Sequence, residues 1–161
     1  MKSNSLALGL PVRRRPRPFT LVVFGASGDL AARKLYPAFF SLYREGALDD
    51  WKLLGFGRRP WGDEEFRAEV AASLEPLKPG TAELEDFLAA CAYHRGENED
   101  AAAYRSLAAR IGDGRDAVFY LSVPPEQYMP IAEGLSASGL ARRGTGATRV
   151  VVEKPFGRSG A

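Results

Sequence analysis

Seven consecutive residues near the start of the chain have the composition of a loop that binds phosphate. They lie between a short apolar run and a segment with helical spacing, and they are Gly25, Ala26, Ser27, Gly28, Asp29, Leu30 and Ala31. Small residues let the backbone come close to a phosphate group, and the free N–H groups at the start of a helix bind its negative charge. In doubly wound sheets the turn after the first strand holds a dinucleotide pyrophosphate in this way. We therefore expect these seven residues to bind a dinucleotide.

The spacing of this loop is Gly-x-x-Gly-x-x-Ala rather than the commoner Gly-x-Gly-x-x-Gly, which Ser27 and Leu30 do not satisfy. A Gly-x-x-Gly sequence also occurs in many tight turns, so a purely structural turn is the alternative interpretation. The position of the loop after the first apolar run favours nucleotide binding.

Two arginines, Arg58 and Arg59, end the second apolar run, and no acidic residue follows them until Asp63. NAD-using enzymes usually place an acidic residue here against the ribose 2′-hydroxyl, whereas an arginine accommodates the 2′-phosphate of NADP. A carboxylate would repel that phosphate, and a guanidinium binds it through charge-assisted, often bidentate hydrogen bonds. The Ser27 hydroxyl would add a donor to the same phosphate. We therefore expect NADP as the cofactor; the alternative is that both arginines are solvated surface residues.

The composition excludes an internal disulfide and the metal sites that need several cysteines or a pair of histidines. Cys91 is the only cysteine and His94 the only histidine, so the chain has no internal disulfide and no multi-cysteine or paired-histidine metal site. His94 falls on a weakly predicted strand, where we do not expect it to act as a general base. We therefore predict no metal site and no catalytic residue within this chain.

Charge is distributed unevenly along the 161 residues. The net charge is +2, but residues 1–18 contain five basic residues, three prolines and no acidic residue, so the remainder is net negative. We interpret residues 1–18 as a basic, proline-containing, extended arm that lacks the apolar core of a secretory signal. A nucleic-acid-binding domain carries its basic excess on the folded body, and no apolar run approaches the roughly 18 residues of a membrane span. We expect no nucleic-acid or membrane partner and a cytoplasmic location.

Five short apolar runs alternate with segments of helical spacing. The predicted strands are 19–24, 51–56, 92–95, 117–122 and 149–153, and the predicted helices are 30–45, 63–74, 82–90, 101–111 and 124–138. Pro37 lies inside the first helix and predicts a bend or a break there. Continuous apolar strands that alternate with helices indicate a parallel sheet covered on both faces. The fold class is therefore α/β, a doubly wound Rossmann-type sheet with helices on both faces, and residues 19–157 form a dinucleotide-binding domain.

Four segments together resemble the N-terminal coenzyme domain of the glucose-6-phosphate dehydrogenase family. They are Gly25–Pro37, Gly55–Arg58, Tyr120–Pro125 and Glu153–Gly157, the last with the sequence Glu-Lys-Pro-Phe-Gly. The segments occur in the family's order, and the first and last are specific motifs. The resemblance implies that residues 25–31 bind the pyrophosphate of NADP and that Arg58 and Ser27 bind its 2′-phosphate. It also implies that Pro124 borders the nicotinamide half.

The resemblance implies a substrate and a reaction as well. Lys154 would lie between the coenzyme and glucose 6-phosphate and bind both, and Lys34 would approach the same cleft. The full enzyme would oxidise glucose 6-phosphate to 6-phosphogluconolactone with NADP, a step of the pentose phosphate pathway.

The resemblance covers only part of the family's sequence. In the family the catalytic histidine, its carboxylate partner and most sugar-phosphate ligands lie downstream, in a segment resembling Arg-x-Asp-His-Tyr-x-Gly-Lys. The second, larger domain, through which family members form oligomers, is also downstream. Residues 1–161 contain neither, so we expect the chain alone to be inactive. Two alternatives stay open: a stand-alone NADP-binding or regulatory module, and the coenzyme domain of a glucose–fructose oxidoreductase-like enzyme, whose members show Gly-x-Gly-x-x-Gly.

Overall fold

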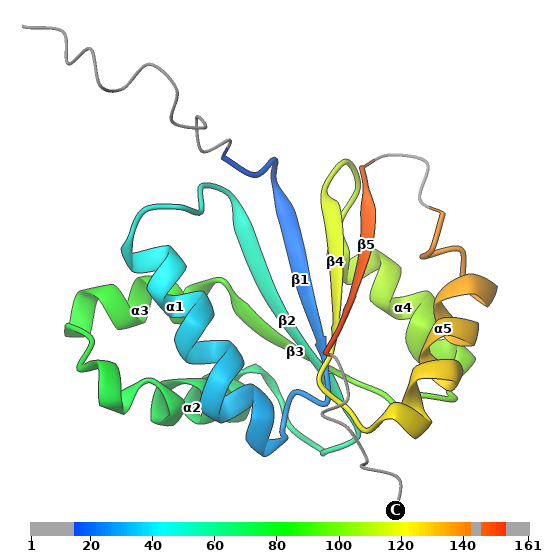
Figure 1. Ribbon diagram of the computed structural model, residues 1–161, viewed down its shortest axis with the longest axis horizontal. Helices are drawn as coiled ribbons and strands as arrows, with labels where there is room; N and C mark the ends of the chain where they lie inside the picture. The colour runs from blue at the N-terminus through cyan, green and yellow to red at the C-terminus, as the bar shows by residue number, and fades with distance from the viewer. Residues whose placement is uncertain (1–14, 143–145, 154–161) are drawn as a thin grey trace, which may run out of the picture.

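Five parallel strands form one sheet in the order β3-β2-β1-β4-β5 (Figure 1). The structure is a computed structural model that describes residues 15–142 and 146–153. The strands are β1 (Phe19–Phe24), β2 (Trp51–Gly57), β3 (Cys91–Arg95), β4 (Asp116–Leu121) and β5 (Thr148–Val152). The helices are α1 (Tyr36–Arg44), α2 (Asp63–Ser73), α3 (Thr81–Ala89), α4 (Ala101–Ile111) and α5 (Tyr128–Ala137). This arrangement confirms the predicted doubly wound α/β fold.

Helices cover both faces of the sheet, with α1, α2 and α3 on one face and α4 and α5 on the other (Figure 1). The central strand β1 is buried along its whole length, and its successive side chains point to opposite faces. Leu21 and Val23 accordingly pack into the core under α1–α3, whereas Val22 and Phe24 pack into the core under α4 and α5. Two separate cores explain why this strand is a continuous apolar run rather than an alternating one.

Three short turns distinguish the observed helices from the predicted ones. The predicted helix 30–45 is interrupted by a π-helical turn, η2 (Ala31–Leu35), directly before α1. Pro37 lies in the first turn of α1, directly after the π-helical turn. A proline has no N–H for the preceding turn and its ring would crowd a regular α-helical turn there. The irregularity predicted at Pro37 is thus present. A 3₁₀ turn, η4 (Pro125–Gln127), replaces the start of the predicted helix 124–138. A second 3₁₀ turn, η3 (Glu75–Leu77), follows α2 just beyond the end of the predicted helix 63–74.

The two edges of the sheet differ. Along the outer edge of β3, the Asp63 carboxylate accepts a hydrogen bond from Tyr93 N at 2.8 Å and Arg67 Nε donates to Cys91 O at 2.8 Å. Arg110 donates to Tyr93 O at 3.3 Å. Side chains therefore occupy main-chain groups that would otherwise pair with another strand.

The opposite edge strand, β5, carries apolar side chains on the surface instead. Val150, Val151 and Val152 are 51%, 39% and 51% exposed. An apolar edge of this kind is a site of strand-to-strand association.

Several sequence expectations fall wholly or partly outside the described residues. Residues 1–14 of the expected arm and Lys154 lie there, whereas Arg15 forms an ion pair with Asp49. Within residues 15–142 and 146–153 no helix has the length and hydropathy of a membrane-spanning segment, and no cluster of His, Cys, Asp or Glu could hold a metal ion.

Candidate dinucleotide-binding site

A cleft of about 420 Å³ opens where the carboxyl ends of β1, β2, β3 and β4 meet. The register places Phe24, the last residue of β1, between Phe56 of β2 and Leu121 of β4, so the loops after these strands converge. In doubly wound sheets, ligands bind outside the carboxyl ends of the strands, at the point beside the central strand where the strand order reverses. The cleft is lined by Gly25, Ser27, Gly28, Gly57, Arg58, Gly96, Glu97, Asn98, Glu99, Ser122, Val123, Pro124 and Gln127.

The first loop of the cleft makes a tight turn that depends on Gly25. This residue has φ +76°, and a Cβ atom there would lie 2.1 Å from the carbonyl oxygen of Ser122. Gly28 N then donates to Gly25 O at 3.0 Å, and Gly28 O accepts from Ala32 N at 3.2 Å, which begins the helix. Since the first N–H groups of a helix have no acceptor within it, the turn brings free donors and the positive end of the helix dipole to the cleft. The arrangement suits an anionic group.

A buried tyrosine holds this loop from below. The Tyr36 hydroxyl donates to Ala26 O at 2.6 Å, and the Tyr36 ring packs edge-on against Phe66, with centroids 5.9 Å apart. Burial is the main cause that holds the pKa of Tyr36 far above its ordinary value, so the hydroxyl remains a donor. Tyr36 was not among the residues predicted from sequence, because nothing in a single sequence relates it to Ala26.

The two arginines after β2 have different surroundings. Arg58 is exposed and lines the cleft. The guanidinium of Arg59 lies over the ring of Trp61, 5.4 Å from its centroid, in a cation–π arrangement. The next acid, Asp63, is engaged at the edge of β3, where it also lies 3.5 Å from Arg110. Arg58 is therefore the charged side chain that the end of β2 contributes to the cleft.

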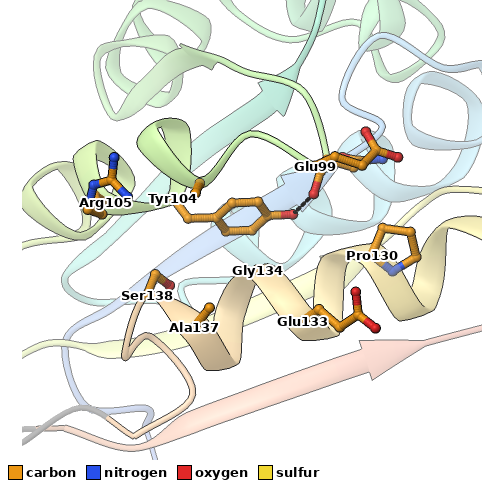
Figure 2. Close-up of a pocket in the computed structure, with 10 residues that line it drawn as sticks. Glu99, Tyr104, Arg105, Pro130, Glu133, Gly134, Ala137 and Ser138 are labelled. Atoms are coloured by element: carbon orange, nitrogen blue, oxygen red, sulfur yellow. Dashed lines mark hydrogen bonds between the residues drawn. The ribbon is translucent and has the colours of Figure 1, made fainter.

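The far wall of the cleft is the loop between β3 and α4. Asn98 Nδ2 donates to Gln127 Oε1 at 3.0 Å and so joins this loop to the turn before α5. The Tyr104 hydroxyl donates to Asn98 O at 2.7 Å. Figure 2 shows the Tyr104 ring crossing Gly134 of α5, where a Cβ atom would lie 2.4 Å from Tyr104 Cζ. Asn98, Gln127 and Tyr104 were missed at the sequence level, since their partners are distant in the chain.

A second hollow, of about 360 Å³, lies between α4 and α5 (Figure 2). Asn98 and Glu99 line both this hollow and the cleft. The β3–α4 loop is thus a thin partition between the two spaces, and Tyr104 fixes it in place.

The structure gathers some of the expected site residues and separates others. Those that line the cleft are Gly25, Ser27, Gly28, Arg58 and Pro124. Asp29, Leu30 and Ala31 begin the helix, with Asp29 in an exposed pair with Arg33 at 3.3 Å, and Lys34 is exposed on η2.

His94 is bonded within the fold rather than directed to the cleft. Its ring stacks on Phe56 with centroids 5.8 Å apart, and Nε2 lies 3.0 Å from both Ala103 O and Ser106 Oγ. Burial lowers the pKa of His94, an effect that the charge of Arg110 reinforces and the Ala103 hydrogen bond opposes. The imidazole therefore joins β3 to α4.

Comparisons with known proteins agree on one family. The sequence-family model for the NAD-binding domain of glucose-6-phosphate dehydrogenase matches residues 22–161. Glucose-6-phosphate 1-dehydrogenase of Chlamydia pneumoniae is 38% identical over 93% of this chain, and that of Leuconostoc mesenteroides is 38% identical over 87%. The chain covers 32% and 30% of these two proteins, so it spans about a third of the length of its relatives.

Solved structures give the same result. A glucose-6-phosphate dehydrogenase in complex with its substrate glucose-6-phosphate superposes with a TM-score of 0.79 at 33% identity, over 89% of this chain and 32% of that one. Glucose-6-phosphate 1-dehydrogenase from Mycobacterium avium superposes with a TM-score of 0.77 at 26% identity, over 88% and 31%. These matches decide against the glucose–fructose oxidoreductase-like alternative. The chain belongs to the glucose-6-phosphate dehydrogenase family, in which it corresponds to the N-terminal domain that binds a nicotinamide dinucleotide.

Proposed function

We propose that this chain binds NADP and is the coenzyme domain of a glucose-6-phosphate dehydrogenase. The observation that carries the choice of NADP is the end of β2, where Arg58 lines the cleft and the first acid, Asp63, is engaged elsewhere. An acid directly after β2 would suit the ribose 2′-hydroxyl of NAD, and an arginine suits the 2′-phosphate of NADP. The two glutamates of the cleft, Glu97 and Glu99, follow β3 instead.

The main chain of the cleft also fits a dinucleotide. A side chain at Gly25 would collide with the main chain of Ser122, so glycine at this position lets the chain turn closely past the end of β4 and places the following loop residues at the edge where a pyrophosphate binds in this fold. Residues 25–31 would bind the pyrophosphate, Ser27 and Arg58 the 2′-phosphate, and Pro124 would border the nicotinamide. The positive charge of Arg59 would also attract the 2′-phosphate.

The reaction proposed for the whole protein is oxidation of glucose 6-phosphate to 6-phosphogluconolactone. The nicotinamide, when bound, accepts the hydride, and the protein binds and orients the reactants. Lys34 and Lys154 would bind the sugar phosphate. The general base and the oligomer contacts would belong to the part of the relatives that residues 1–161 do not match, and the protein would act in the cytoplasm without a nucleic-acid or membrane partner.

Calorimetric titration with NADP⁺ and NAD⁺ tests the cofactor assignment. We expect the 161-residue chain to bind NADP⁺ more tightly, because only NADP⁺ carries the phosphate that Arg58 and Ser27 would contact. Equal affinity for the two dinucleotides would contradict the proposal.

A further inference from the structure

The side chain of Ser122 is buried in the cleft without a hydrogen bond. Ser122 is the first residue after β4 and is 8% exposed. Its Oγ atom is buried and has no hydrogen-bond partner among the described residues, although the residue lines the cleft. Most buried polar side-chain atoms in proteins have a partner, and leaving one unsatisfied costs free energy. A bound ligand could supply the hydrogen-bond partner that this hydroxyl lacks.

The main chain fixes Ser122 firmly at this position. Ser122 N donates to Phe24 O at 3.0 Å, which extends the pairing of β1 and β4 by one residue. The carbonyl oxygen of Ser122 lies so close to Gly25 that a Cβ atom on Gly25 would be only 2.1 Å from it. The hydroxyl is thus held beside the glycine loop on the β4 side of β1, whereas Arg58 follows β2 on the other side.

Apart from Gln127, the neighbouring side chains on this wall are apolar. Val123 and Pro124 have no polar side-chain atom, and the side-chain Oε1 of Gln127 already accepts from Asn98, which leaves the Gln127 Nε2 as the other polar group beside Ser122. A polar group of a ligand against this wall would meet the Ser122 hydroxyl, which can donate to a phosphate or ribose oxygen and accept from a ribose hydroxyl.

We propose that Ser122 is a further cofactor-binding residue, whose hydroxyl hydrogen-bonds to the ribose-phosphate of the nicotinamide half of the dinucleotide. The proposal rests on the dinucleotide function proposed above. Because the two halves of a dinucleotide lie on opposite sides of the central strand, the half that carries the 2′-phosphate belongs with Arg58. The other half then lies against β4 and Ser122.

The Ser122→Ala substitution tests this assignment, because it removes one oxygen atom and keeps the backbone. We expect NADP⁺ to bind roughly three- to tenfold more weakly, the range for one lost hydrogen bond. Adenosine 2′,5′-bisphosphate, which lacks the nicotinamide half, should bind with unchanged affinity. The melting temperature of the ligand-free chain should be unchanged or higher, since the hydroxyl has no partner in the protein.

Ser73→Ala is the matched control. The Ser73 hydroxyl donates to Val70 O at 2.6 Å in α2, and Ser73 does not line the cleft. This variant should keep wild-type affinity for both ligands, with a melting temperature that is equal or lower.

Three results would overturn the proposal. If Ser122→Ala binds NADP⁺ with unchanged affinity, the role proposed for Ser122 is wrong, whereas the choice of NADP as cofactor is unaffected. An equal loss for adenosine 2′,5′-bisphosphate would place the hydroxyl on the other half, and a lower melting temperature of the ligand-free variant would give it a structural role. A wild-type chain that binds neither NADP⁺ nor NAD⁺ would overturn the proposed function and this assignment together.

Discussion

The hydroxyl of Tyr36 and the carbonyl oxygen of Ala26 are 2.6 Å apart in the buried base of the cleft. The contact ties the glycine loop to the first turn of α1, just after the π-helical turn. Tyr104 makes a comparable contact with Asn98 O at 2.7 Å on the far wall. Each of the two loops is thus held from inside by a tyrosine hydroxyl on a main-chain carbonyl, and the shape of the cleft depends on these two bonds.

Tyr36→Phe should weaken cofactor binding and lower stability together. The substitution keeps the packed ring but leaves the buried Ala26 carbonyl without its donor, a cost of about 1–3 kcal/mol. Denaturant unfolding and calorimetric titration with NADP⁺ measure the two effects. Tyr43→Phe is the control, because the Tyr43 hydroxyl bonds to exposed Asp86, away from the cleft, and should leave affinity unchanged. Wild-type affinity in Tyr36→Phe would show that the loop keeps its shape without this bond.

Arg58→Ala should reduce NADP⁺ affinity by about 1.5–3 kcal/mol, the value for hydrogen bonds to a charged group, and should leave NAD⁺ affinity nearly unchanged. Arg59→Ala provides a control at the adjacent position, because the Arg59 guanidinium lies over Trp61. This variant should lose less NADP⁺ affinity than Arg58→Ala. Parallel titrations of both variants with both dinucleotides give the comparison. A larger loss in Arg59→Ala would exchange the roles of the two residues.

Gly28→Val should abolish dinucleotide binding and leave the chain folded. The φ of Gly28 is not in the left-handed region, and a Cβ atom there would meet only Gly25 O, at 3.2 Å, so the fold tolerates it with a small shift. The valine branches would occupy the space over the loop where a pyrophosphate approaches. Far-ultraviolet circular dichroism checks the fold and calorimetry the binding. Binding at near-normal strength would place the dinucleotide away from this loop.

The stability of the chain should fall on acidification through the range in which His94 titrates. Burial lowers the pKa of His94 in the folded state below its ordinary value of 6.5. The unfolded state therefore takes up a proton first as the pH falls, and the free energy of unfolding decreases from about pH 6.5 downwards until the folded state is also protonated. His94→Gln should flatten this part of the curve in urea titrations between pH 5 and 8. Parallel curves for the two proteins would assign the acid sensitivity to other groups.

A preparation of residues 1–161 should self-associate through the exposed valines of β5. Val151→Lys should keep it monomeric at higher concentration, because lysine on an edge strand opposes pairing with another strand. Met129→Lys is the control, since Met129 is 65% exposed on α5 rather than on the edge. Sedimentation velocity over a concentration series measures the change. Equal improvement by both variants would indicate a general effect of added charge.

Much of the fold was predictable because burial on both faces leaves a clear pattern in the sequence. The run Phe19–Phe24 is apolar except for Thr20, whose buried hydroxyl donates to Ile111 O, because the cores on both faces of the sheet take its side chains. The irregularity at Pro37 could be anticipated, but its form as a π-helical turn could not, because it depends on how α1 packs. The turn at Pro125–Gln127 was missed for a related reason: a proline fits the first turn of either a 3₁₀ or an α-helix.

The site was only partly predictable, because residue type does not reveal orientation or partners. Arg58 and Arg59 are equivalent in the sequence, whereas in the structure one lines the cleft and the other lies over Trp61. Ser122 is an ordinary serine at a strand end until the fold buries it and supplies no partner. Such properties arise from tertiary contacts and leave no periodic pattern.

The contact between Gly25 and Ser122 also bears on the order of events during folding. The two residues are about 100 positions apart, and closing so long a loop is among the slower steps of folding. The β1–β2 half of the sheet can form while the polypeptide is still being synthesised, but the cleft does not exist until β4 has docked beside β1. A dinucleotide that binds only the completed cleft cannot assist the early steps. It stabilises the finished domain by mass action, so cellular cofactor concentration should influence how long the domain stays folded more than how fast it folds.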